Sequence, residues 1–166
     1  MWEARLGADH PDTAATLENL GLVLHEQGDL VAARSCHERA LRMREIRPGP
    51  NHPDTGRGLN NLARVLRDLH NLDQARDLLE RALVIFEEWH GPDHRDTTCT
   101  MHNLGLVLHD QGDLATAHAL HERALRIREA LPHPDDLDIA WSLNHLAGWY
   151  AIWATATRPA SCSSAP

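Results

Sequence analysis

Hydrophobic residues recur at steps of three and four positions along most of the chain, which is the spacing of one face of an α-helix. One run contains Leu17, Leu20 and Leu24, and a second run begins at Leu30, directly after the segment QGD. The pattern therefore predicts helical hairpins, in which a short turn joins two antiparallel helices. No period-two alternation typical of a β-strand competes with it.

Residues that start and end helices stand between these runs. We expect Asp12 or Thr13 to cap the first helix, Gly28 to adopt the left-handed conformation at its end, and Asp29 to cap the second helix. Three prolines between residues 48 and 53 interrupt any continuation of the second helix. Each hairpin is thus expected to be a closed unit.

The hairpin pattern returns with a period of 42 residues. HPDT at His10–Thr13 recurs as HPDT at His52–Thr55 and as HRDT at His94–Thr97, and GLVLHEQGDL at 21–30 returns as GLVLHDQGDL at 105–114. A fixed period of this length indicates a repeat architecture.

Small residues at fixed places indicate the type of repeat. The first unit has Gly21 on its first helix and Ala33 and Ala40 on its second, and NNLA, QGDL and ERAL recur along the chain. This spacing resembles tetratricopeptide repeats of the 42-residue kind found in kinesin light chains and in bacterial signalling proteins, over approximately residues 1–150. The resemblance implies an all-α fold, a right-handed α-solenoid of antiparallel helical hairpins.

The period also predicts the domain organisation. We expect one array over residues 1–153, and a disordered tail rich in Ser, Thr, Ala and Pro at 154–166. The incomplete units at both ends indicate an excerpt or a remnant of a longer array. The expected units are the end of a preceding repeat at 1–9, repeats at 10–51, 52–93 and 94–132, and a partial repeat or capping helix at 133–153.

Two histidines depart from the family pattern. His37 and His121 stand where these repeats usually carry an aromatic core residue. We expect both rings to lie at the margin between helices. Near the other end of the array, Trp149 and Trp153 are expected to leave an apolar patch.

Composition narrows the functional classes. The 24 acidic residues outnumber the 16 basic ones, all of them Arg, and the formal net charge is −8 at pH 7. This balance argues against a nucleic-acid or membrane-surface partner. No signal peptide or membrane span is indicated, so we expect a cytoplasmic protein. Protonation of all 13 histidines would move the formal charge from −8 to +5, so mild acid should matter.

In such a solenoid the first helices line the concave face, and their residues opposite the apolar stripe would meet a partner. The resemblance adds that the repeated Asn, here Asn19, Asn61 and Asn103, contacts the backbone of a bound peptide. The residues predicted to bind a peptide or protein segment are Asn19, Arg57, Asn60, Asn61, Arg64, Arg67, His102, Asn103 and His109.

The three arginines of this face allow two interpretations. Arg57, Arg64 and Arg67 would receive an acidic side chain or the C-terminus of a partner, because guanidinium groups bind carboxylates with paired hydrogen bonds. Alternatively, they form surface ion pairs with Asp68 or neighbouring acids.

Candidate chemistry is sparse. His37-Glu38 begins like the zinc motif HExxH, but Leu41 occupies the place of the second histidine. The pairs His102/His109 and His118/His121 lack a third ligand, and no phosphate-binding loop or activated nucleophile is present. We expect no enzyme activity, no cofactor and no metal site. The sequence predicts an interaction scaffold within a larger regulatory protein, or alternatively an assembly module that associates through its ends.

Overall fold

The computed structural model describes residues 11–130. The units expected at 1–9 and 133–153 and the tail expected at 154–166 lie outside the described residues. Within the described range the chain forms α-helices and no strand. They are α2 (Pro11–Glu26), α3 (Leu30–Ile46), α4 (Pro53–Asp68), α5 (Leu72–His90), α6 (Arg95–Asp110) and α7 (Leu114–Ala130).

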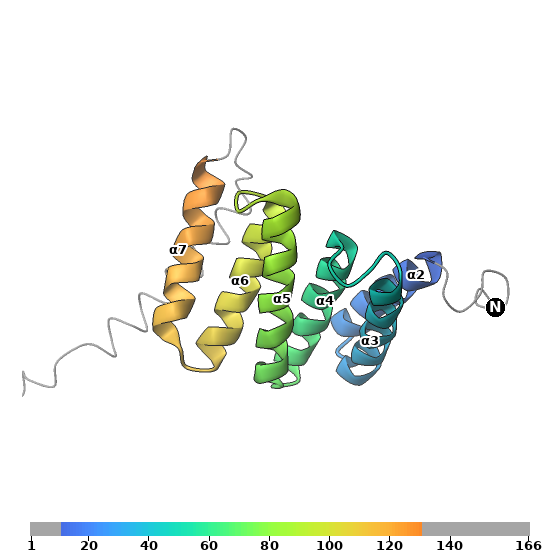
Figure 1. The fold of residues 1–166 in the computed structure, drawn as a ribbon. Coiled ribbons are helices and arrows are strands. Elements are labelled where there is room, and N and C mark those ends of the chain that lie inside the picture. The colour runs from blue at the N-terminus through green and yellow to red at the C-terminus, as the bar shows by residue number, and fades with distance from the viewer. Residues whose placement is uncertain (1–10, 131–166) are drawn as a thin grey trace, which may run out of the picture.

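The helices form three hairpins that stack in a row, α2 with α3, α4 with α5, and α6 with α7 (Figure 1). Between hairpins, α3 packs on α4 and α5 packs on α6, while α4 also contacts α2 and α6. The first helices of the three hairpins therefore lie next to one another. The predicted right-handed α-solenoid is confirmed, whereas the boundaries between repeats stay a prediction. None of the described helices is long and apolar enough to cross a membrane.

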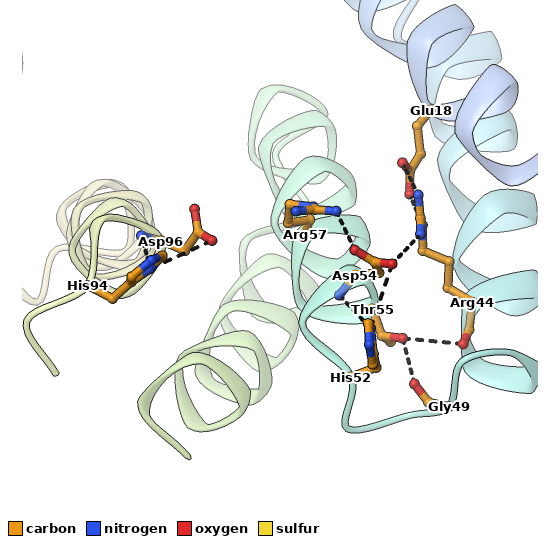
Figure 2. Close-up of polar contacts among 9 residues, drawn as sticks. All are labelled: Glu18, Arg44, Gly49, His52, Asp54, Thr55, Arg57, His94 and Asp96. Atoms are coloured by element: carbon orange, nitrogen blue, oxygen red, sulfur yellow. Dashed lines mark hydrogen bonds and ion pairs between the residues drawn. The ribbon is translucent and has the colours of Figure 1, made fainter. Parts of the chain in front are cut away.

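Histidine caps the first helix of the second and third hairpins. Nδ1 of His52 accepts a hydrogen bond from the backbone N–H of Asp54 at 3.1 Å, and His94 does the same for Asp96 at 3.2 Å (Figure 2). These bonds satisfy one of the backbone donors that a helix start leaves unpaired. The histidine cap therefore explains why the HxD segment recurs at the start of both helices.

The predicted cap of the first helix is wrong, because Asp12 and Thr13 lie within α2, which begins at Pro11. Proline at the first helical position has a helical φ and no N–H that needs a partner. The helix therefore already includes the proline, two or three residues before the predicted start. The predictions for the end of α2 and the start of α3 are confirmed. Gly28 has φ +81°, and Asp29 accepts a hydrogen bond from Ala32 N at 3.1 Å.

The threonines of the second and third HxDT segments hold the preceding linkers in place. Oγ1 of Thr55 donates to the carbonyl oxygen of Gly49 at 2.6 Å, and Oγ1 of Thr97 donates to that of Gly91 at 2.8 Å. Both threonine side chains are fully buried. The motif therefore fixes the turn between one hairpin and the next.

Glycine and histidine pack against each other inside the first and third hairpins. A Cβ on Gly21 would lie 2.6 Å from Nε2 of His37, and one on Gly105 would lie 2.7 Å from the ring of His121. The prediction that these rings lie at the helix margin is therefore wrong. His37 is only 1% exposed, because the missing glycine side chain leaves room for an imidazole in the core.

The apolar face of α2 is less covered than the same face of the later hairpins. Leu20 is 47% exposed, whereas Leu62 and Leu104, one and two periods later, are each 5% exposed. Helices α3 and α5 cover α4 and α6 from the preceding hairpin, and no described helix precedes α2. Leu20 therefore belongs to an exposed apolar face of α2.

Candidate functional site

A groove of about 470 Å³ opens along the side formed by α2, α4 and α6, with Phe86 of α5 at its floor. Nine of the twelve lining residues have polar or charged side chains, and the other three are Phe86, Cys99 and Leu106. Six of the nine predicted residues line this groove. They are Arg57, Asn60, Asn61, Arg64, Arg67 and Asn103.

The other three predicted residues lie elsewhere. Asn19 is exposed on α2, and His109 lies beside Asp110 with Nδ1 3.4 Å from Oδ1; neither lines the groove. His102 is 1% exposed, and its ring centroid lies 4.8 Å from that of His121 on α7. Position 102 lies at the edge of the predicted face of α6, on the side that packs against α7. A buried His102 cannot present its ring to a ligand in the groove.

The three groove arginines differ in their partners. Arg57 pairs with Asp54 on its own helix, and Nε of Arg67 lies 2.9 Å from Oδ2 of Asp110. Arg64 is exposed and forms no hydrogen bond or ion pair with any described residue. The ion-pair interpretation thus describes Arg57 and Arg67, and Arg64 keeps its donors available.

Asp68 is not the partner of these arginines. Its Oδ2 lies 2.6 Å from Nε2 of His25 on α2. This contact joins α2 to α4 at the groove, as the Arg67–Asp110 pair joins α4 to α6.

Two asparagines bridge α4 and α6 across the groove. Nδ2 of Asn103 donates to Oδ1 of Asn60 at 2.9 Å, and Nδ2 of Asn60 donates to Oγ1 of Thr100 at 2.5 Å. Both amide atoms of Asn60 are therefore engaged. Asn61 lines the groove and has no hydrogen-bond partner among residues 11–130, so its donor and acceptor both remain available.

A charged network joins the first three described helices beside the groove (Figure 2). Arg44 of α3 binds Glu18 of α2 with two hydrogen bonds, Nε–Oε1 at 2.5 Å and Nη2–Oε2 at 2.7 Å, and its Nη1 lies 3.3 Å from Oδ2 of Asp54. Asp54 in turn binds Arg57. The hydrogen bond to Glu18 raises the pKa of the Arg44 guanidinium above its ordinary value. The network orients Arg57 at the groove.

Six residues that line the groove are absent from the predicted set. They are His25, Asp68, Phe86, Asp96, Cys99 and Leu106. The ring of Phe86 packs on Gly56, where a Cβ would lie 2.9 Å from Cζ. A signal was present, because Gly56 stands where the other repeats have Ala14 and Thr98 and the second repeat carries the chain's single Phe. Asp96 belongs to the HxDT segment, which was interpreted only as the start of a helix.

The described helices and the groove define a protein of the helical-hairpin repeat class. The family model for the tetratricopeptide repeat matches residues 1–46, 12–83, 54–130 and 96–153. The chain therefore belongs to the tetratricopeptide repeat family. Among curated proteins, none matches the sequence.

Solved structures with the same fold include kinesin-light-chain-like proteins. BtubC (BKLC) from P. vanneervenii has a TM-score of 0.77 and 21% identity, covering 94% of this chain and 70% of that one. The nearly identical TPR-like repeats of a kinesin light chain from Podosopora anserina have a TM-score of 0.76 and 22% identity, covering 85% and 67%. The first TPR of Spaghetti (RPAP3), bound to the HSP90 peptide SRMEEVD, has a TM-score of 0.62 and 17% identity, covering 86% and 94%. At these identities the likeness shows the fold alone.

Proposed function

We propose that the chain is a protein-interaction module that holds an extended, acidic segment of a partner protein in the groove of α2, α4 and α6. The observation that carries this proposal is Arg64, an exposed guanidinium without a hydrogen-bond or ion-pair partner among residues 11–130, in a groove whose other arginines are paired. A guanidinium in this state can bind a carboxylate through paired hydrogen bonds. The module would act as a scaffold within a larger regulatory protein.

The neighbouring amide supports an extended occupant. Asn61 lies three residues before Arg64 on α4, and both residues line the groove. Asn61 keeps both its donor and its acceptor available. An extended backbone offers one N–H and one C=O per residue, which an amide side chain can match. Together the two residues would read a backbone and an acidic side chain or C-terminus. The peptide SRMEEVD on the first TPR of Spaghetti is acidic at its C-terminal end, which supports this class of ligand.

The test is an array of immobilised ten-residue peptides probed with the labelled chain. We expect the bound peptides to be enriched in Asp and Glu, and Arg64→Glu to weaken their binding about tenfold or more, because a charge-assisted hydrogen bond is replaced by repulsion. Affinities of the strongest peptides are then measured by fluorescence polarisation.

Arg42→Glu provides the matched control. Arg42 is exposed on α3, lies outside the groove and has no partner among the described residues, so the change in net charge is identical. It should leave peptide affinity within about twofold, since long-range charge effects are screened by salt. Equal losses for the two variants, or peptides without acidic enrichment, would show that Arg64 does not read a carboxylate.

An assembly role is the second candidate, and the exposed face of α2 favours it. Leu20 and Val23 are about half exposed, while Val65 and Val107, the counterparts of Val23, are buried. We expect the second helix of another hairpin to cover this face as α3 covers α4. The mass measured by light scattering should then rise with concentration, and Leu20→Glu with Val23→Glu should abolish the rise. A constant monomer mass for the unmodified chain at high concentration would rule the assembly out.

A further inference from the structure

Three metal-ligating side chains meet where α5 ends and α6 begins. His90 is the last residue of α5, His94 caps α6, and Asp96 lies in the first turn of α6. One ligand atom from each of the three, a ring nitrogen or a carboxylate oxygen, lies within 4.8 Å of the other two. Gly91, with φ +86°, turns the chain between the two helices and brings His90 back toward His94.

The two rings are already placed side by side. The ring centroids of His90 and His94 lie 4.2 Å apart in a stacked arrangement, and His90 stacks on Phe86 at 6.0 Å. Nδ1 of His94 accepts the backbone hydrogen bond that caps α6 and lies 3.8 Å from Oδ2 of Asp96 (Figure 2). Nδ1 has a single in-plane lone pair, so an ion bound through the His94 ring would take the place of this capping hydrogen bond.

We propose that His90, His94 and Asp96 bind a divalent transition-metal ion of the Zn²⁺ type at the α5–α6 junction. Two imidazoles and one carboxylate form a donor set that suits Zn²⁺, whereas Mg²⁺ and Ca²⁺ prefer oxygen ligands throughout. In a tetrahedral zinc site with bonds of 2.0–2.2 Å, ligand atoms lie about 3.3 Å apart. The three atoms must therefore approach by about 1.5 Å at most, which side-chain rotations achieve, since both histidines are exposed and Asp96 is half-buried.

Sequence reasoning missed this trio because it compared histidines within single helices. The trio instead spans two helices, and its first member is absent from the preceding junction. There His52 and Asp54 repeat the pair His94 and Asp96, but Pro48 stands at the position of His90. The α3–α4 junction is therefore a natural control that keeps the cap and lacks the third ligand.

A bound ion would link the end of one hairpin to the start of the next. Asp96 also lines the groove, so coordination would neutralise its negative charge at the place where an acidic segment is proposed to bind. Three protein ligands leave a fourth position open to water or to a ligand carboxylate. The metal site itself does not depend on the proposed peptide function.

The experiment is isothermal titration of Zn²⁺ into the full chain after removal of metals by a chelator, at pH 7.5 and without peptide. We expect the unmodified chain to bind one ion at this site. His90→Ala should weaken that binding at least tenfold or abolish it, and Asp96→Asn should weaken it as well. His52→Ala, which removes an equivalent cap histidine from the control junction, should leave the affinity unchanged.

A second measurement separates a built site from scattered surface binding. Zn²⁺ should raise the melting temperature of the unmodified chain and of His52→Ala, but not that of His90→Ala. Absence of binding by the unmodified chain, or equal affinity in His90→Ala, would overturn the proposal. Neither outcome would bear on the Arg64 peptide test.

Discussion

Replacing Arg44 with alanine should lower the free energy of unfolding by about 3 kcal/mol, the lower end of the range for breaking a buried ion pair. The side chains of Arg44 and Glu18 are only 12% and 13% exposed. The substitution leaves the carboxylate of Glu18 buried without a cation and removes a partner of Asp54. The loss is measured by urea unfolding followed by circular dichroism.

Arg34→Ala is the matched control for this prediction. Nε of Arg34 lies 2.6 Å from Oε1 of Glu38, as close as the contacts of Arg44, but the two side chains are 38% and 35% exposed. An exposed pair of this type contributes about 0.3–0.5 kcal/mol, because water solvates both charges once they separate. Equal losses for Arg34→Ala and Arg44→Ala would mean that burial does not govern the Arg44 network.

Arg44→Lys tests the geometry of the same network. Lysine keeps the positive charge but not the planar fork that binds both carboxylate oxygens of Glu18. An intermediate loss of stability is therefore expected. The variant also separates charge from shape at the place where Arg57 is oriented for the groove.

The helices could be predicted from the sequence because the information is local and repeated. Apolar spacing marks each helix, and Gly28 and Asp29 mark the turn. The start of α2 was misjudged because the prediction considered Asp12 and Thr13 and not Pro11. Proline at the first helical position has a helical φ and no N–H that needs a partner, so α2 already includes Pro11.

The face of the groove was predictable, whereas its ion pairs were not. Helical angle alone directs Arg57, Arg64 and Arg67 to one side of α4. Arg57 pairs with Asp54 on its own helix, whereas the pairing of Arg67 depends on the distance between hairpins, which no single helix contains. Several contacts between successive first helices join residues 43 positions apart. Examples are His25 with Asp68, Asn60 with Asn103 and Arg67 with Asp110.

The sequence contains an indication that His37 and His121 are buried, but it can be recognised only once the packing of the helices is known. The repeats that carry His at the core position of the second helix, at His37 and His121, carry Gly on the first helix. The repeat with Leu79 there carries Ala63. The pairs exchange volume, so a ring faces a glycine and a leucine faces an alanine. Such compensation is invisible to a reading of one helix at a time.

The burial of His37 against Gly21 should make the free energy of unfolding sensitive to mild acid. Burial lowers the pKa of His37 below the ordinary histidine value of 6.5; nearby Glu18 acts in the opposite direction, and His25 and Arg64 act in the same one. The unfolded chain therefore binds a proton more readily than the folded chain. Stability should be fully present above pH 6.5 and fall as the pH decreases below it, by at most about 1.4 kcal/mol per pH unit for this one group.

The double substitution Gly21→Ala and His37→Leu should reduce this dependence. It copies the pair Ala63 and Leu79 of the second repeat, whose side chains are buried. It also removes two buried ring nitrogens that have no hydrogen-bond partner among residues 11–130, which should stabilise the chain by about 1–3 kcal/mol at pH 7.5. Urea unfolding at pH 7.5, 6.5 and 5.5 measures both effects.

His70→Asn is the control for the loss of a histidine in general. His70 is exposed and has φ 59°, a left-handed conformation that asparagine tolerates. This variant should lose stability in acid as steeply as the unmodified chain, because it leaves the buried ring of His37 in place. If the double variant and the His70 variant have equal slopes, His37 does not cause the acid sensitivity. The slope would then come from other groups whose proton affinity changes on unfolding.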